Sequence, residues 1–167
     1  ALFVNGNSAY NIRRGDAMLN DKAKVITSAV FGYGPKEADK IGKGVARQYG
    51  KGDEGFNVSS CQFAMHYMFE DKRVFYNFIR NVAECTKLYG YFIATCYDGR
   101  TIFNMLKRKQ EGESREIYVD DKKVWSITKQ YDATTFEDNE SCLGYKIDVY
   151  QDSINQTLPE YLVNFDY

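Results

Sequence analysis

The hydrophobic positions in the middle of the chain predict a strand, a helix and a second strand. Residues 72–86 place apolar side chains three and four positions apart, which is typical of an amphipathic helix. The runs at 55–62 and 91–96 are short and apolar, as expected of buried strands. A strand, a crossover helix and a parallel strand form an α/β unit, whose ligands bind at the carboxyl ends of the strands. Gln62 and residues 96–99 are expected at those ends.

Weaker patterns flank this unit. Residues 1–4 are apolar and precede an Asn-Gly pair, which predicts a short strand that runs into a turn. Residues 37–49 carry a helical pattern, and residues 88–90 are expected to end the central helix at a glycine. Residues 101–109 predict a second short helix with a basic end.

The last third of the chain has a different pattern of apolar and polar residues. Apolar and polar residues alternate over 116–119, 124–128 and 145–150, with acidic loops between them. This pattern predicts antiparallel strands. A helix is expected to begin at residues 158–163, because proline is favoured in the first turn of a helix and Pro159 lies there.

These elements divide the expected single domain, residues 1–167, into three parts. We expect residues 1–110 to form an α/β core portion, residues 111–157 to form an antiparallel insertion, and residues 158–167 to start a helix. A chain with 44% hydrophobic and 16% aromatic residues can bury one substantial core, which excludes a disordered protein. It contains no run of eighteen apolar residues, so no membrane segment is expected.

The charge balance and the cysteine content limit which ligands the protein can be expected to bind. The 22 basic and 23 acidic residues nearly cancel, so any contact with nucleic acid must be local. The lysines and arginine that recur over residues 36–51 could follow RNA phosphates or form a solvated helix face. The four cysteines have no zinc-type spacing and the chain has one histidine, so we expect no metal site. Free thiols are typical of an intracellular protein.

One block, residues 56–70, contains Cys-Gln-Phe followed closely by His-Tyr and resembles the signature of messenger-RNA cap guanine-N7 methyltransferases. Three further blocks extend the resemblance in the same order, at residues 90–95, 144–150 and 158–163. Residues 96–99 and 149–155 resemble the versions found in large DNA viruses. A viral enzyme of this kind would work in the host cytoplasm or the virion, and a cellular one in the nucleus.

The resemblance implies an α/β, Rossmann-like, class I methyltransferase fold that uses S-adenosylmethionine (SAM) and releases S-adenosylhomocysteine. It implies that Gln62 touches SAM, that Tyr67 lies between SAM and the cap, and that His66 lies at the cap guanosine. It makes Glu160 the carboxylate that binds the cap guanine. The implied substrate is 5′-capped RNA, and other capping domains are possible partners. No residue is expected to act as a catalytic acid or base, so catalysis would come from positioning.

The first block departs from the family. Residues 3–8 resemble the segment whose Asp-Ser binds the adenine side of SAM, but here the pair is Asn7 and Ser8. The asparagine keeps a hydrogen-bond acceptor and loses a charge. The family's glycine-rich SAM loop precedes this block and is not in the sequence. We therefore expect further sequence or a partner segment to complete the sheet, because a strand at residues 2–4 would otherwise lack a neighbour.

Each candidate also has an ordinary structural interpretation. Gln62 could bond a neighbouring loop, His66 and Tyr67 could be core residues, Asn7 and Ser8 could form a turn, and Glu160 could be a first-turn acid. Two other functions therefore stay open. The chain could be a SAM methyltransferase for another substrate, or a non-catalytic methyltransferase-like subunit that binds a partner.

Overall fold

The computed structural model describes all 167 residues, and the chain forms a mixed α/β protein that divides into two compact units. Unit 1 comprises Ala1–Cys61 and Arg73–Ala94, and unit 2 comprises Gln62–Lys72 and Thr95–Tyr167. One two-stranded sheet and one four-stranded sheet are present.

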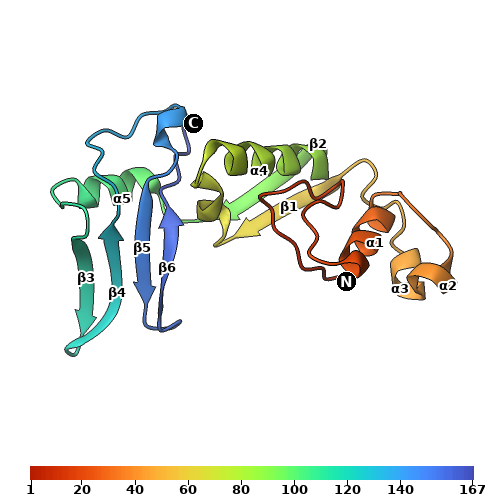
Figure 1. Ribbon diagram of the computed structural model, residues 1–167, viewed down its shortest axis with the longest axis horizontal. Helices are drawn as coiled ribbons and strands as arrows, with labels where there is room; N and C mark the ends of the chain where they lie inside the picture. Colours follow the sequence, from red (N-terminus) through yellow and green to blue (C-terminus); the bar gives the residue numbers. More distant parts are fainter. The chain divides into compact units, whose positions relative to one another are not determined.

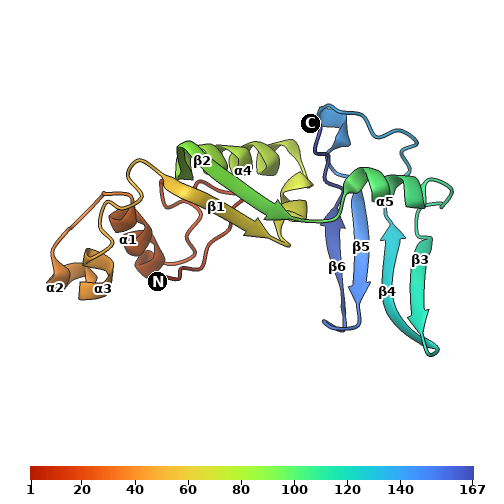
Figure 2. The same cartoon turned by 180° about the vertical axis from the view of Figure 1, so that it is seen from behind.

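The predicted strand–helix–strand unit is confirmed. Strand β1 (Phe56–Gln62) is followed by helix α4 (Lys72–Cys85) and strand β2 (Thr86–Thr95). The arrows of β1 and β2 point the same way in both views, so the paired strands are parallel, and α4 runs along them (Figures 1 and 2). Helix α4 buries the apolar side that its periodicity predicted, formed by Val74, Phe75 and Phe78.

The predicted helix stop at residues 88–90 is wrong, because these residues lie inside β2. Gly90 therefore lies within a strand and does not end a helix. A Cβ at this position would lie 2.9 Å from the carbonyl oxygens of Asn57 and Lys87. The glycine therefore allows a close approach of two backbones, one of them in β1.

The amino-terminal part of unit 1 differs most from its prediction. Helix α1 (Asp21–Val30) starts at Asn20, whose side chain accepts a hydrogen bond from the Ala23 amide. The helix expected over 37–49 is two short helices, α2 (Ala38–Ile41) and α3 (Lys43–Ala46), because Gly42 between them has φ 86°. The strand expected at residues 1–4 is absent, and the nearest pairing is a single bridge between Gly6 and Met18.

Asn81 on α4 anchors the loop that follows the amino terminus. Its amide nitrogen donates to the carbonyl oxygens of Ser8 (2.9 Å) and Tyr10 (2.7 Å), and its oxygen accepts from the Ile12 amide (2.9 Å). These three bonds satisfy a buried side chain and fix the loop against the helix.

Unit 2 contains an antiparallel sheet of four strands, three of which the alternation predicted. Its strands are β3 (Ser114–Val119), β4 (Lys122–Lys129), β5 (Lys146–Gln151) and β6 (Gln156–Tyr161), paired in that order. All three pairings are antiparallel. Helix α5 (Gly99–Leu106) packs across one end of this sheet (Figures 1 and 2).

The helix expected to begin at residues 158–163 is instead strand β6, so Glu160 lies in a strand and not in a first helical turn. Proline lacks an amide hydrogen and is tolerated in edge strands, where that hydrogen is not needed for pairing. Strand β6 is an edge of the sheet, and Pro159 is paired opposite Asp148 of β5. Residues 158–161 thus belong to the same sheet as the strands before them.

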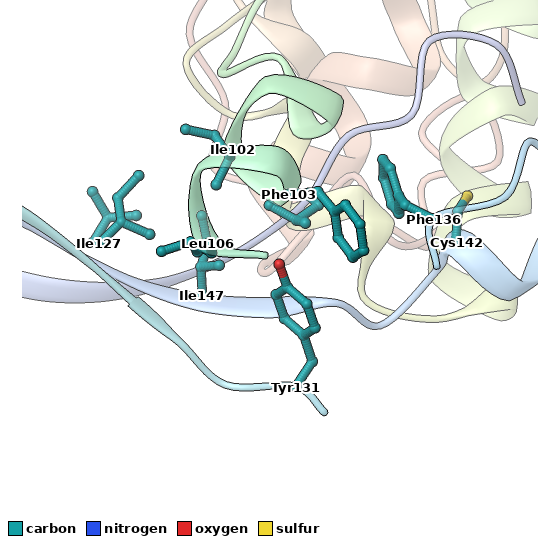
Figure 3. Close-up of a cluster of buried hydrophobic side chains, with 10 residues drawn as sticks. Ile102, Phe103, Leu106, Ile127, Tyr131, Phe136, Cys142 and Ile147 are labelled. Atoms are coloured by element: carbon teal, nitrogen blue, oxygen red, sulfur yellow. The ribbon is translucent and has the colours of Figure 1, made fainter. Parts of the chain in front are cut away.

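The core of unit 2 fills the space between α5 and the sheet. Figure 3 shows its side chains, with the rings of Phe103 and Phe136 stacked at 5.5 Å. The buried members of this cluster are Ile102, Phe103, Leu106, Ile127, Tyr131, Phe136, Cys142, Ile147, Val149 and Leu162. Asp98 begins α5 by accepting from the Arg100 amide (3.0 Å). A Cβ on Gly99 would overlap the Val163 backbone, so α5 can start there only with glycine.

None of the helices combines the length and the apolar character that a bilayer crossing requires. All four cysteines are free thiols.

Candidate functional site

A pocket of about 450 Å³ lies in unit 2 and contains three of the predicted site residues. That volume is within the usual range for a small-molecule site. The pocket is lined by Phe63, His66, Tyr67, Cys96, Tyr97, Gln151, Ser153, Ile154, Leu158 and Glu160. His66, Tyr67 and Glu160 come together although about ninety residues separate them along the chain.

The 3₁₀-helix η1 (Met65–Phe69) carries His66 and Tyr67, and it contacts β6, which carries Glu160. Two hydrogen bonds fasten this end of the site. The Gly144 amide donates to the Phe69 carbonyl (2.9 Å), and the Tyr161 hydroxyl donates to the Glu70 carboxylate (3.1 Å). The site residues thus sit on elements that the sheet holds in place.

Glu160 and His66 are buried polar residues, and three of their side-chain atoms lack a hydrogen-bond partner. Their side chains are 9% and 7% exposed, and the Glu160 Oε2 atom and both ring nitrogens of His66 lack a partner. His66 Nδ1 lies 3.5 Å from Glu160 Oε2, too far for a good hydrogen bond. Buried polar atoms are nearly always satisfied, so unsatisfied atoms that line a pocket indicate a place for a polar ligand.

Burial also sets the protonation of this pair. It lowers the pKa of His66 to about 4 and raises the pKa of Glu160 to about 7. At neutral pH His66 is uncharged, so its contact with Glu160 is not an ion pair. A ligand that donates hydrogen bonds to the carboxylate would favour the ionised form of Glu160.

Tyr67 completes the buried corner of the pocket. Its ring meets the His66 ring edge-on, with the centroids 4.3 Å apart. Burial, and then the nearby charge of Glu160, raises the pKa of its hydroxyl. An aromatic face beside a carboxylate can accept a flat heterocycle or an organic cation.

Gln62 is at the carboxyl end of β1, next to the pocket residue Phe63. The Gln62 oxygen accepts a hydrogen bond from the Thr95 hydroxyl (2.9 Å), a contact across the ends of the two parallel strands. The Phe63 amide donates to the same hydroxyl (3.0 Å) and to the Thr95 carbonyl (3.0 Å). Phe63 has φ 52°, a conformation that bulky residues rarely adopt, and its ring is exposed at the pocket.

Asn7 and Ser8 belong to unit 1 and are not among the lining residues. The Asn7 side-chain oxygen accepts from the Ala9 amide (2.9 Å), which is an Asx-turn. The Ser8 carbonyl accepts from Asn81. Their predicted contact with SAM stays a prediction.

Several lining residues were not predicted from the sequence. The Tyr97 hydroxyl accepts hydrogen bonds from Trp125 Nε1 (3.0 Å) and Gln151 Nε2 (3.2 Å), which fixes the wall of the pocket. Tyr97 lies in the segment 96–99, which was expected at a strand end, so its position could have been found. The positions of Gln151 and Trp125 could not be predicted from the sequence, because they depend on the register in which β4 pairs with β5.

The chemistry of the pocket defines a class of ligand. It offers an unpaired buried carboxylate, a neutral imidazole and aromatic rings, and no group of three or more metal-ligating side chains occurs in the structure. Such a site suits a flat nitrogen heterocycle that donates hydrogen bonds from one edge.

Comparison with known proteins agrees with this chemistry. A profile of the mRNA (guanine-N(7))-methyltransferase domain family matches residues 9–167. The chain belongs to that family, which confirms the resemblance seen in the sequence.

Individual relatives include viral and cellular proteins. The chain is 32% identical over 111 residues to a probable mRNA-capping enzyme of Acanthamoeba polyphaga mimivirus, covering 65% of this chain and 9% of the relative. It is 36% identical over 109 residues to the mRNA cap guanine-N(7) methyltransferase of Drosophila melanogaster, covering 65% and 23%. A Caenorhabditis briggsae enzyme of the same name is 40% identical over 60 residues, covering 36% and 16%. The chain therefore spans a quarter or less of the relatives it matches.

Proposed function

We propose that this chain carries the cap-guanine site of an mRNA (guanine-N7)-methyltransferase, which transfers a methyl group from SAM to the guanine of the 5′ RNA cap. One observation carries the proposal. Glu160, whose Oε2 atom is buried and has no hydrogen-bond partner, lines a pocket together with His66 and Tyr67. Family membership and the names of the relatives support the same function.

The carboxylate selects guanine by hydrogen bonding. Guanine presents two donors side by side on its pairing edge, and one carboxylate can accept both. Adenine presents an acceptor at the ring position and is rejected. By analogy with bidentate base readout, the contact discriminates by about 1–3 kcal/mol. His66 and Tyr67 then flank the base.

This orientation leaves the reacting atom free. N7 lies on the opposite side of the purine from the edge that Glu160 would hold. N7 carries a lone pair and no proton, so its methylation needs no general base. That agrees with a pocket whose histidine is buried and neutral. Glu160, His66 and Tyr67 act by holding the base in line with the methyl donor.

The residues fit the methyl donor chemically. SAM supplies an electrophilic methyl group on a sulfonium cation. The Tyr67 face suits a cation at this pocket, and Gln62 at the end of β1 offers a polar side chain next to the pocket residue Phe63. We keep Asn7 and Ser8 as lower-ranked candidates for the adenine side, since Asn7 already accepts from Ala9.

The finer architecture is part of this proposal. Residues 1–110 form part of a Rossmann-like class I methyltransferase core within a single domain, and the antiparallel sheet is an insertion that includes β6. The substrate is 5′-capped RNA, and other capping domains are the expected partners. The protein works inside the cell, in the nucleus for a cellular enzyme or the host cytoplasm for a viral one.

The test is a methyl-transfer assay with labelled SAM and RNA that carries an unmethylated GpppN cap, followed by digestion and detection of N7-methylguanosine. Product is expected with capped RNA and not with uncapped RNA. Glu160→Ala should abolish the cap dependence and leave SAM affinity near normal, whereas Gln62→Ala should weaken SAM binding more than cap binding. Glu116→Gln is the control, because this exposed carboxylate lies on another strand of the same sheet and pairs only with Tyr118 and Lys123.

The outcomes separate the rival functions. SAM binding that a cap analogue does not affect would indicate a methyltransferase for another substrate. Failure to bind SAM would favour a non-catalytic subunit. Equal loss of SAM and cap binding in Glu160→Ala would give that residue a structural role and remove the observation on which the proposal depends.

A further inference from the structure

Unit 1 contains a second cavity, of about 520 Å³, that shares no residue with the pocket around Glu160. Three arginines line it together with one carboxylate and two hydroxyl side chains. The lining residues are Arg13, Arg14, Ser28, Tyr33, Arg80 and Glu84. None of them was assigned a role from the sequence.

Two of the arginines are held in place by the fold. Arg13 donates to the Glu84 carbonyl (3.1 Å) and to the Asp53 carbonyl, and its guanidinium lies over the Phe31 ring, 5.1 Å from the centroid. Arg80 donates from Nε to the Glu84 carboxylate (2.6 Å), one helical turn away on α4. Both side chains are therefore fixed before any ligand arrives, which reduces the entropy lost on binding.

The third arginine has no such partner. The Arg14 backbone amide donates to Asn11 Oδ1 (2.7 Å), which fixes its position in the loop. Its guanidinium makes no hydrogen bond or ion pair, although it lines the cavity. A guanidinium carries five donors, so Arg14 offers the cavity a complete unused set.

The charges of the lining do not balance. The bond from Arg80 and the bond from Asn11 lower the pKa of Glu84, and the charge of Arg14 adds to the effect, so Glu84 is ionised at neutral pH. One carboxylate thus faces three guanidinium groups. Asp53 neutralises part of Arg13 from outside the lining, at 3.5 Å. An excess of positive charge remains, and it is concentrated at Arg14, because Arg80 is paired with Glu84.

We propose that this cavity binds a phosphodiester group in the RNA chain of the substrate, a contact separate from the cap. The planar fork of arginine matches two phosphate oxygens, and several arginines around one cavity are a typical phosphate site. The half-exposed Tyr33 ring lies at the same cavity, and an aromatic ring beside basic groups is the usual combination for single-stranded nucleic acid. The proposal rests on the proposed function for the identity of the RNA.

The test uses the full chain and a labelled, uncapped 12-nucleotide RNA, so that the cavity is probed without the guanine site. Arg14→Gln should weaken RNA binding about tenfold at low salt, the loss expected for a charge-assisted hydrogen bond. It should also reduce the slope of log affinity against log salt by about 0.7, the value for one phosphate contact on a single strand. Arg80→Gln should act in the same direction, and Tyr33→Ala should weaken binding by loss of stacking.

Lys22→Gln is the matched control. It removes the same charge from an exposed position of unit 1 that does not line the cavity, and affinity should change less than twofold. Thermal unfolding of each variant is measured in parallel. Arg14 makes no side-chain bond, so its replacement should not alter the melting temperature.

Three results would overturn the proposal. If Arg14→Gln binds RNA as tightly as wild type, the cavity is not the RNA-binding site. If Arg14→Gln and Lys22→Gln lose RNA affinity equally, the RNA is held only by diffuse charge attraction. Inorganic phosphate that binds as tightly as the RNA would assign the cavity to a free anion. Binding of the cap analogue GpppG is measured separately. Its absence beside Arg14-dependent RNA binding would reject the proposed function and keep the RNA site.

Discussion

The two compact units bury their sheets very differently. In unit 2, α5 packs across one end of the four-stranded sheet, and Leu106 and Ile127 are fully buried in the core that they share. In unit 1, the paired strands β1 and β2 leave large apolar side chains exposed. Leu88 is 80% and Tyr91 70% exposed.

The difference matches the kind of site in each unit. The pocket with unsatisfied buried groups lies in the unit with the complete core, where packing fixes Glu160 and His66. A group without a hydrogen bond can be kept buried only if the surrounding structure is stable enough to bear the cost. The cavity of unit 1 is lined by charged side chains at the surface, which need no dry environment to bind an anion.

The largest expected effect comes from breaking the core of unit 2. Leu106→Ala removes the side chain of a fully buried leucine of α5, and such substitutions cost about 2–5 kcal/mol. The loss should appear as a lower midpoint of urea unfolding. Cap binding should be lost at a lower urea concentration than RNA binding to the arginine cavity, because only the first site belongs to this core. Simultaneous loss of both would show that the two units unfold together.

A smaller effect concerns the pH dependence of stability at Glu160. Its pKa in the folded protein is raised to about 7, above the value of 4.5 for an ordinary Glu side chain. The stabilisation from the protonated form is therefore complete below about pH 4.5 and is lost as the pH rises through 7. Glu160→Gln has no proton to lose, so its stability relative to wild type should increase between those limits, by at most about 3 kcal/mol.

Unfolding at a series of pH values measures this difference. His66, whose pKa is lowered to about 4, works in the opposite sense, because its contribution is lost as the pH falls from 6.5 to about 4. This term is common to both proteins and largely cancels. A constant difference between Glu160→Gln and wild type across the range would show that burial does not perturb the carboxyl. Under the proposed function, the same substitution should also weaken cap binding, because the amide cannot accept both guanine donors.

The sequence predicted the regular elements where one periodicity dominated. The helix at Lys72–Cys85 and the strands β3, β4 and β5 follow directly from the spacing of apolar residues. The helix predicted to begin at residues 158–163 is wrong because proline is compatible with both a first helical turn and an edge strand. The pairing of β6 with β5 at the edge of the sheet decides between helix and strand here. This pairing depends on the fold of the whole unit and not on the local sequence.

The candidate site was predicted by resemblance and not by periodicity. Composition gave no reason to join His66 with Glu160, and the structure brings both into one pocket. The roles assigned to them stay predictions until they are tested. Asn7 and Ser8 could not be related to that pocket, because they belong to the other unit and their local bonds form a turn.

The smallest expected change in stability comes from a substitution on the exposed face of unit 1. Leu88→Thr replaces an exposed leucine of β2 with a residue that also favours strands. If this face is open to water, the free energy of unfolding should change by no more than about 0.5 kcal/mol. Urea unfolding of Leu88→Thr beside Leu106→Ala gives the measurement and its reference. A loss above 1 kcal/mol would mean that Leu88 is covered in the protein in solution, and the contrast between the two units would then reflect an interface and not a difference in packing.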